Sequence, residues 1–312
     1  MDQSPQMDDP SSSIGALISL LADESKSTQI AATKALISLG AQASSALEVA
    51  ANGEDPRVRA RARRVLASMA RESGEAALRS LLAPVDQEPA EGRGVKGEGV
   101  LIDGLLAIDN ILGFREPHPQ GPHPAGLHPS GSRRCVADAA IADWAAELRD
   151  ADAWKEGPTL AASGALRRIL ADKAGLAGPD RDFHNLQHVS LSRTIVNGTG
   201  LPLTLSAIYA TVARQNGLEA WLLPFPGQVL LALGPDSDRV LMDPFHRGAL
   251  VSLSTCRARL AAMGAPDSPH WLSPASDRDM LVRQTRNLGA AMERHGRDRD
   301  ARLFARLVDS AT

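Results

Sequence analysis

Hydroxyl, carboxylate and imidazole side chains occur together in the stretch from Gly200 to Gly248, and these groups can carry out acyl transfer. Thr204 and Ser206 lie at the start of one apolar segment, Asp243 ends another, and His246 follows three residues later. A hydroxyl attacks an amide only when a general base within hydrogen-bond reach takes its proton. His246 is the candidate base, with Asp243 to orient its imidazole. The hypothesis predicts a hydrogen bond between His246 and one of the two hydroxyls.

Regular elements must hold these side chains. Gly200 allows an unusual backbone angle and Pro202 suits a first helical turn, so a helix is expected to start here and run through Tyr209. Beyond it, three short apolar stretches separated by turn residues predict a small antiparallel sheet. These stretches are Ala220–Leu223, Val229–Leu233 and Arg239–Met242.

Helices are expected over most of the remaining chain. Phe, Trp and Tyr together make up only 3% of the residues, whereas strands prefer aromatic and β-branched side chains. Amphipathic patterns predict helices over Val100–Leu112, Val136–Arg149, Thr159–Leu170, Phe183–Val196, Asp279–His295 and Asp298–Val308. The predicted fold class is α+β and predominantly α-helical.

A series of motifs runs through the central stretch: Gly200-x-Pro202, Tyr209, Gly217-Leu218, Pro226-Gly227 and Asp243-Pro244-Phe245. This series resembles the transglutaminase-like superfamily, specifically its bacterial SirB-type branch, and the likeness runs from about Glu98 to Val308. Near the end of the chain, Arg283, Asn287 and Leu288 match the Arg-x-x-x-Asn-Leu of a tetratricopeptide-like helix in that branch. The resemblance implies a transglutaminase-like core followed by a tetratricopeptide-like helix pair.

The resemblance also implies positions for a catalytic triad. In the wider superfamily a cysteine at a helix start attacks an amide, a histidine takes the thiol proton and an aspartate orients the imidazole. Residue by residue, the nucleophile position falls at or beside Thr204, the histidine position is Gln228 and the aspartate position is Asp243. No cysteine lies near Thr204, and a neutral amide cannot carry a proton at physiological pH. The frame is expected to be retained without the family's nucleophile and base.

The first part of the chain repeats itself. Leu17 matches Leu47 and Leu36 matches Leu66 at an offset of 30 residues, which predicts two helix pairs. The second pair carries Asp55-Pro56-Arg57-Val58-Arg59, which resembles the Asp-Pro-x-Val-Arg signature of HEAT repeats. These patterns predict a short HEAT-like array, whose units bury apolar faces against their neighbours.

Composition and motifs together predict five segments. These are a disordered leader at 1–13, HEAT-like repeats at 14–83, a Pro- and Gly-rich linker at 84–99, the transglutaminase-like domain at 100–265 with a Pro/Gly/His loop at 117–132, and a C-terminal helix pair at 266–312.

Two further groups of side chains are candidate sites. Arg57, Arg61 and Arg64 fall on one side of a helix, where they could bind an acidic protein segment or a phosphate, although a solvated face is the usual explanation. His184 and His188 are four apart in an expected helix, a spacing that can hold zinc. Because no third ligand is recognisable, no metal and no cofactor are expected.

Overall composition excludes several classes of partner. A net charge of −3 gives no general attraction to nucleic acid or anionic lipid, and no apolar run reaches the roughly 18 residues of a membrane span. Two isolated cysteines, Cys135 and Cys256, build neither a disulfide framework nor a zinc site, so a reducing cytoplasm is expected.

Two functional hypotheses follow. In the first, the protein is noncatalytic and its former active-site cleft binds a protein or peptide segment. The alternative is an acyl-transfer enzyme or amide hydrolase that uses the hydroxyl of Thr204 or Ser206 with His246 and Asp243.

Overall fold

The computed structural model describes residues 10–84, 99–113, 133–151, 158–266 and 268–311, and these divide into two compact units, Met1–Glu75 and Ala76–Thr312. The first helix begins at Pro10, inside the segment 1–13 that the sequence predicts to be a disordered leader. Almost all of the expected linker, and the Pro/Gly/His loop after residue 117, lie outside the described residues.

The first unit contains two helix pairs, as the 30-residue repeat predicts. Its helices are α1 (Pro10–Leu20), α2 (Lys26–Leu39), α3 (Ala41–Ala51) and the greater part of α4 (Pro56–Leu82). Asp55 caps α4 by accepting hydrogen bonds from the backbone N–H groups of Arg57 and Val58, at 2.7 and 3.3 Å. An aspartate before proline therefore starts this helix for the reason that the sequence indicates. Assignment of the pairs to HEAT-like repeats stays a prediction.

Small apolar side chains fill the interior of the first unit. Leu36 and Leu47 are fully buried there, together with Ala32, Ala43 and Ala62. The division from the second unit falls within α4, after Glu75, whereas the sequence places a boundary after residue 83. The reason is that the last turns of α4 contribute buried side chains, Leu78 and Leu82, to the core of the second unit.

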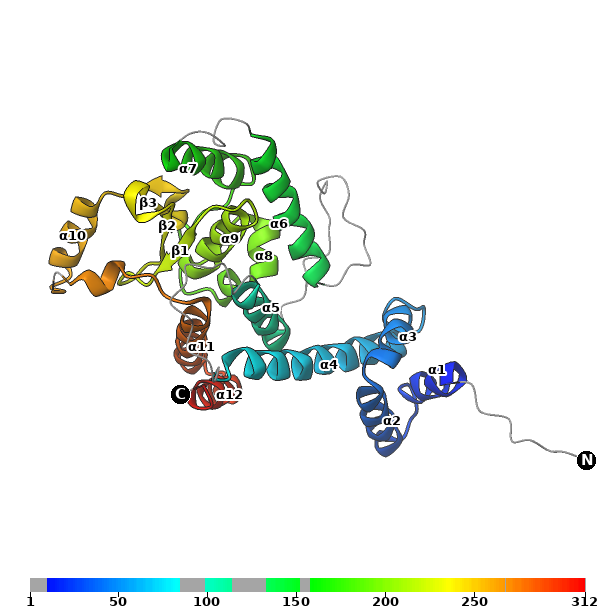
Figure 1. Cartoon of the computed structure of the whole chain (residues 1–312). Helices are drawn as coiled ribbons and strands as arrows, with labels where there is room; N and C mark the ends of the chain where they lie inside the picture. Colours follow the sequence, from blue (N-terminus) through cyan, green and yellow to red (C-terminus); the bar gives the residue numbers. More distant parts are fainter. Residues whose placement is uncertain (1–9, 85–98, 114–132, 152–157, 267, 312) are drawn as a thin grey trace, which may run out of the picture. The chain divides into compact units, whose positions relative to one another are not determined.

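Helix α9 (Pro202–Arg214) lies at the centre of the second unit. Ten of its residues, from Leu203 to Ala213, are buried, because it is apolar on all sides. It packs against α5 (Val100–Leu112), α6 (Arg133–Asp150) and α8 (Leu191–Asn197), and also against β1 (Ala220–Leu223) and β2 (Leu230–Leu233) (Figure 1). The helix expected after Gly200 is thus the axis of the core.

The sheet is antiparallel and has four strands in the order β1-β2-β3-β4. Leu222 of β1 pairs with Leu231 of β2, which pairs with Met242 of β3 (Val240–Asp243). The fourth strand, β4 (Ala249–Leu250), was not expected; its two residues are too few to give a periodic signal. It pairs with the end of β3 through Asp243 and Ala249. The predominantly helical α+β class is confirmed.

Four more helices complete the second unit. They are α7 (Thr159–Arg167), which continues as a π-helical segment to Lys173, α10 (Leu253–Ala262), α11 (Asp277–Arg294) and α12 (Asp298–Asp309). Gly296, at a φ of 66°, makes the turn between α11 and α12, and the two helices pack together. Sequence analysis did not predict α10.

One expected helix, Phe183–Val196, is wrong. Residues Leu186–Val189 form a 3₁₀ turn, and α8 starts separately after Ser190, whose hydroxyl accepts a hydrogen bond from the backbone N–H of Arg193 at 3.2 Å. The break arises because a serine side chain at this position caps a new helix. His184 consequently lies outside both elements, and the argument that His184 and His188 share one helical face no longer applies.

Candidate functional site

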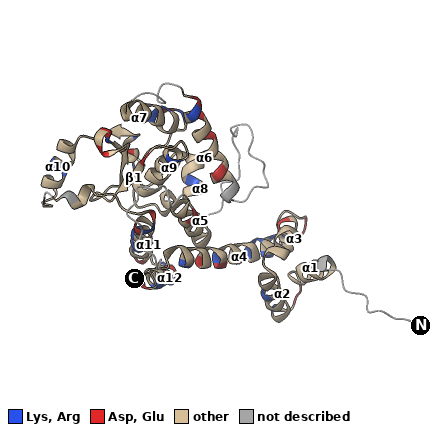
Figure 2. Cartoon of the chain, in the orientation of Figure 1, with Lys and Arg blue, Asp and Glu red and all other residues tan. Residues whose placement is uncertain are grey.

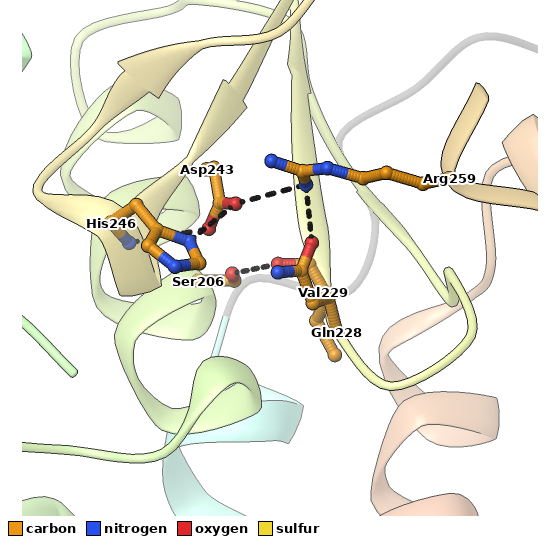
Figure 3. Close-up of polar contacts among 6 residues, drawn as sticks. All are labelled: Ser206, Gln228, Val229, Asp243, His246 and Arg259. Carbon is orange, nitrogen blue, oxygen red and sulfur yellow. Dashed lines mark hydrogen bonds and ion pairs between the residues drawn. The ribbon is translucent and has the colours of Figure 1, made fainter. Parts of the chain in front are cut away.

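Asp243 ends β3 with its carboxylate buried: its side chain is only 1% exposed. Its Oδ2 lies 2.8 Å from Nδ1 of His246, and its Oδ1 accepts from the backbone N–H of His246 at 3.3 Å (Figure 3). The sequence Asp-Pro-Phe-His makes both contacts local, because the carboxylate caps the 3₁₀ turn Pro244–His246. Asp243 therefore pins the turn and also contacts the imidazole.

Gln228, at the histidine position that the resemblance implies, lies in the turn before β2. Its side-chain oxygen accepts a hydrogen bond of 2.7 Å from Nη1 of Arg259, and the same nitrogen lies 3.4 Å from Oδ2 of Asp243 (Figure 3). Arg259 belongs to α10. Arg259 thus contacts both of the side chains at the positions that the resemblance assigns to histidine and aspartate.

Gln228, Asp243, His246 and Arg259 are called the Asp243 cluster below. His246 is half-exposed and Arg259 is 37% exposed at the side chain, so only the carboxylate is withdrawn from water. An imidazole that donates its Nδ1 proton to a carboxylate presents Nε2 as an acceptor, which is the arrangement of a histidine base. The cluster therefore contains two of the three groups of a catalytic triad, a carboxylate and an imidazole.

Both candidate hydroxyls are buried and donate to backbone carbonyl groups. Thr204 Oγ1 lies 3.1 Å from the carbonyl oxygen of Val189, and Ser206 Oγ lies 2.9 Å from that of Val229. A hydroxyl has one proton to donate. In this arrangement neither proton is directed at His246, in contrast to the hydrogen bond expected from the sequence. Ser206 lies beside the cluster, because its acceptor, Val229, directly follows Gln228 in the sequence (Figure 3).

Thiol chemistry finds no support at Cys256. This side chain is fully buried on α10 and packs with apolar residues such as Phe225 and Leu260. Burial raises the pKa of its thiol, so the thiolate is disfavoured. The side chain of Cys135 lies outside the described residues. Cys256 therefore behaves as a small apolar core residue.

A cavity of about 320 Å³ lies next to the Asp243 cluster. The start of α9, the turn before β2, the segment 183–189 and one side of α11 line it. Gln228 belongs to this lining, whereas Asp243 and His246 do not. Polar residues of α11 line it as well, namely Arg283, Gln284, Asn287 and Arg294. We call this space the Arg283 cavity.

Arg283 is a partly buried charged residue of this lining. Burial lowers the pKa of its guanidinium, and its one recorded contact among the described residues is a long hydrogen bond of 3.4 Å to the carbonyl oxygen of Phe225. At the opening, Nε2 of His295 lies 3.2 Å from the carbonyl oxygen of His184. The cavity thus contains a partly desolvated cation to which no carboxylate of the described residues is bound.

Figure 2 colours the Lys and Arg positions along α4, and two of the arginines near its start donate hydrogen bonds to other helices' ends. Arg61 donates to the carbonyl oxygen of Leu21, and Arg63 donates to that of Ala51 at 2.9 Å. These carbonyls lie at the ends of α1 and α3, where backbone acceptors lack helical partners. Of the three arginines proposed as a binding patch, Arg57 and Arg64 are exposed, while Arg61 is engaged within the fold.

The described residues contain neither a candidate metal site nor a candidate membrane span. No group of three or more His, Cys, Asp or Glu side chains in these ranges is arranged to hold a metal ion. No described helix combines the length and the apolar character that crossing a bilayer requires.

The central part of the chain is similar to known proteins. The model of the family described as the transglutaminase-like superfamily matches residues 136–286, a range that contains α9 and the whole Asp243 cluster. A UPF0162 protein from Xylella fastidiosa strain Temecula1 is 30% identical over 151 residues, which cover 46% of this chain and 54% of that protein. The UPF0162 protein of strain 9a5c gives the same values.

A more distant relative is eukaryotic. F-box only protein 21 from Homo sapiens is 24% identical over 153 residues, which are 46% of this chain and 24% of that protein. The chain therefore spans about half the length of the UPF0162 proteins and a quarter of the F-box protein. No solved structure matches this chain.

Sequence reasoning missed Arg259 and the role of its helix. Ser252 caps α10 by accepting from the backbone N–H of Thr255 at 3.1 Å, so Ser252-Leu-Ser-Thr was a start signal for a helix. Nothing in the sequence indicates that Arg259 meets Gln228, which is 31 residues earlier. Arg283 and Asn287 stood out through the resemblance, but their place in a cavity appears only in the structure.

Proposed function

Taking residues 136–286 as a transglutaminase-like domain, we propose that this protein binds a protein or peptide segment in its cleft and does not catalyse acyl transfer. One observation carries the proposal. At the position where the family pattern has its histidine, the amide of Gln228 is held by Arg259, which also contacts Asp243. A proton acceptor is therefore absent from this position, and a fixed cation occupies the space between the amide and the carboxylate.

The burial and the hydrogen bonds of the two candidate hydroxyls also support the noncatalytic proposal. Thr204 and Ser206 are buried and donate to carbonyl groups, so an attack by either oxygen would first require breaking a satisfied hydrogen bond. Loss of a general base commonly removes a factor of about 10² to 10⁴ in rate. The same geometry is well suited to keeping the cleft in one shape for a ligand.

The helical parts fit the same role. We propose that the pairs α1–α2 and α3–α4 are HEAT-like and that α11–α12 is tetratricopeptide-like, with the central domain of the SirB type. Helical repeats of these kinds offer extended surfaces to partners. The exposed Arg57 and Arg64 are the candidate contacts of the first unit. The cytoplasm remains the proposed location on the basis of cysteine content alone.

The second candidate is the hydroxyl-based amide hydrolase, and one observation favours it. Nδ1 of His246 lies 2.8 Å from a buried carboxylate, as in a histidine base with its orienting aspartate. A rotation of Ser206 away from Val229 would be needed to supply the nucleophile. This candidate predicts turnover that depends on Ser206 or Thr204, on His246 and on Asp243.

A turnover assay separates the two candidates. The full chain is incubated with glutamine-containing peptides and fluorogenic peptide amides, and release of ammonia or fluorophore is compared with that of the variants Thr204→Ala, Ser206→Ala and His246→Ala. The binding function predicts equal background rates for all four proteins. Turnover by the unaltered chain that one of these substitutions removes would overturn the noncatalytic proposal and establish the hydrolase.

A further inference from the structure

The Arg283 side chain is partly buried in the lining of the Arg283 cavity. Burial lowers the pKa of the Arg283 guanidinium, which means that its charged form is poorly solvated at this position. Among the residues that the structure describes, no carboxylate forms an ion pair with it, and its hydrogen bond to Phe225 is long. A partly buried cation of this kind costs free energy in the unliganded protein and would gain most from an incoming anion.

The start of α9 points to the same kind of ligand. Leu201, Pro202 and Leu203 line the cavity, and no side chain of the described residues caps this end of the 13-residue helix. The N–H groups of an uncapped first turn, with the helix dipole, favour a negative charge. Two separate elements, α9 and α11, therefore present positive potential to one space.

The rest of the lining defines what accompanies the anion. None of the described lining residues is Asp or Glu, while Arg294, His184 and His295 add basic groups near the opening. Apolar side chains form much of the wall, among them Val189, Leu203 and Leu288. A ligand must therefore combine a carboxylate with neighbouring apolar groups, which is the character of an acidic side chain flanked by leucine-like residues in a peptide.

We propose that the Arg283 cavity binds a peptide segment through an acidic side chain, which accepts hydrogen bonds from Arg283 at the uncapped start of α9. Asn287, one helical turn along α11 from Arg283, is placed to bind the peptide backbone. The inference rests on the proposed binding function and specifies its ligand. It assigns charge recognition to Arg283, outside the Asp243 cluster.

Paired peptides test the charge requirement. The probe is rhodamine-labelled Ala-Leu-Glu-Leu-Ala amide, and its control is the same peptide with Gln in place of Glu; binding to the full chain is followed by fluorescence polarisation. A charge-assisted contact predicts that the Glu peptide binds about tenfold more tightly than the Gln peptide. Equal affinity of the two peptides would overturn the proposal.

Variants on one helix locate the preference. Arg283→Gln should abolish the difference between the peptides, whereas Arg286→Gln should preserve it, because Arg286 is an exposed residue of α11 outside the cavity lining. Circular dichroism and the melting temperature show whether each variant folds. If Arg283→Gln does not fold, Arg283→Lys is used, and it should keep a reduced preference since it retains the charge but not the planar fork. A full preference in either Arg283 variant contradicts the assignment.

Competition and product analysis separate the remaining outcomes. Acetate or inorganic phosphate that displaces the Glu peptide near that peptide's own Kd would overturn the peptide assignment, because a free anion would then suffice. Tight binding of both peptides leaves the binding function intact and removes the acid preference. Cleavage of a bound Glu peptide, seen by mass spectrometry, leaves the acid preference intact and removes the noncatalytic function.

Discussion

The Asp243 cluster and the Arg283 cavity adjoin each other through Gln228, yet they treat charge in opposite ways. In the cluster, the buried carboxylate of Asp243 contacts His246 and Arg259, and Arg259 also holds Gln228. In the cavity, Arg283 is partly desolvated without a bound carboxylate among the described residues. A group whose partners are all present stabilises the fold, whereas a group without a partner is available to a ligand.

This contrast changes how the catalytic positions are interpreted. Resemblance draws attention to Asp243 and Gln228 because they occupy the positions of an aspartate and a histidine. Their contacts give them a structural explanation, since Asp243 caps a turn and joins β3 to α10 through Arg259. Arg283 has a weaker structural explanation, because its one hydrogen bond among the described residues, to the carbonyl oxygen of Phe225, is long at 3.4 Å. Stability measurements on variants of the two regions test this division of roles.

Asp243→Ala is expected to give the largest loss of stability. It removes a carboxylate that is 1% exposed, leaves the backbone N–H of His246 without this acceptor, and leaves the guanidinium of Arg259 with only its hydrogen bond to Gln228 among the described residues. Hydrogen bonds to charged groups suggest a loss of about 2–3 kcal/mol in the free energy of unfolding. Urea denaturation at pH 7 measures it. A loss below that of an exposed control, Asp236→Ala, would break the comparison by showing that the cluster is not structural.

Ser206→Ala and Thr204→Val should each have a smaller effect. Each substitution removes one hydroxyl that donates to a buried carbonyl, that of Val229 or Val189, and leaves the carbonyl without this donor. Losses of about 1–2 kcal/mol are expected from urea denaturation. Neutral effects for both variants would indicate that the hydroxyls are free to serve another purpose, which would strengthen the hydrolase candidate.

Arg283→Met is expected to cause no appreciable loss of stability. Because burial disfavours the guanidinium, replacing it by an apolar side chain of similar length should leave stability within about 1 kcal/mol or raise it. The matched control is Arg259→Met, which should destabilise by removing the contacts to Gln228 and Asp243. Equal destabilisation by both variants would remove the distinction between the two regions.

The sequence predicted elements whose signals are local. Proline and glycine marked the start of α9, the turn residues marked three of the four strands, and Gly296 marked the turn between α11 and α12. The prediction failed where a single capping side chain determines where a helix begins. The apolar spacing of Phe183–Val196 suits one helix, but Ser190 caps a second one. The start signal at Ser252 was missed, and α10 with it.

Prediction of the candidate site divides in the same way. The contact between Asp243 and His246 spans three residues and follows from the Asp-Pro turn itself. By contrast, the bridge from Arg259 to Gln228 and the convergence of α9 with α11 join residues far apart in the chain. Only tertiary packing brings them together, and a single sequence carries no record of it.

Asp238 provides the smallest expected effect and a check on how carboxylates act outside the cluster. Its Oδ2 accepts a hydrogen bond of 2.6 Å from the backbone N–H of Thr159, at the start of α7, and the hydrogen bonds from Thr159 lower the pKa of Asp238 below its ordinary value of 3.8. A lowered pKa in the folded state means that the contribution to stability is present above pH 3.8 and is lost as the pH falls through the folded value. Asp238→Asn should therefore lower the urea midpoint slightly at pH 7, and the difference from the unaltered chain should shrink below about pH 4. A difference that stays constant from pH 7 to pH 3 would show that the charge of the Asp238 carboxylate does not contribute to stability, in contrast to the contribution expected of the buried Asp243.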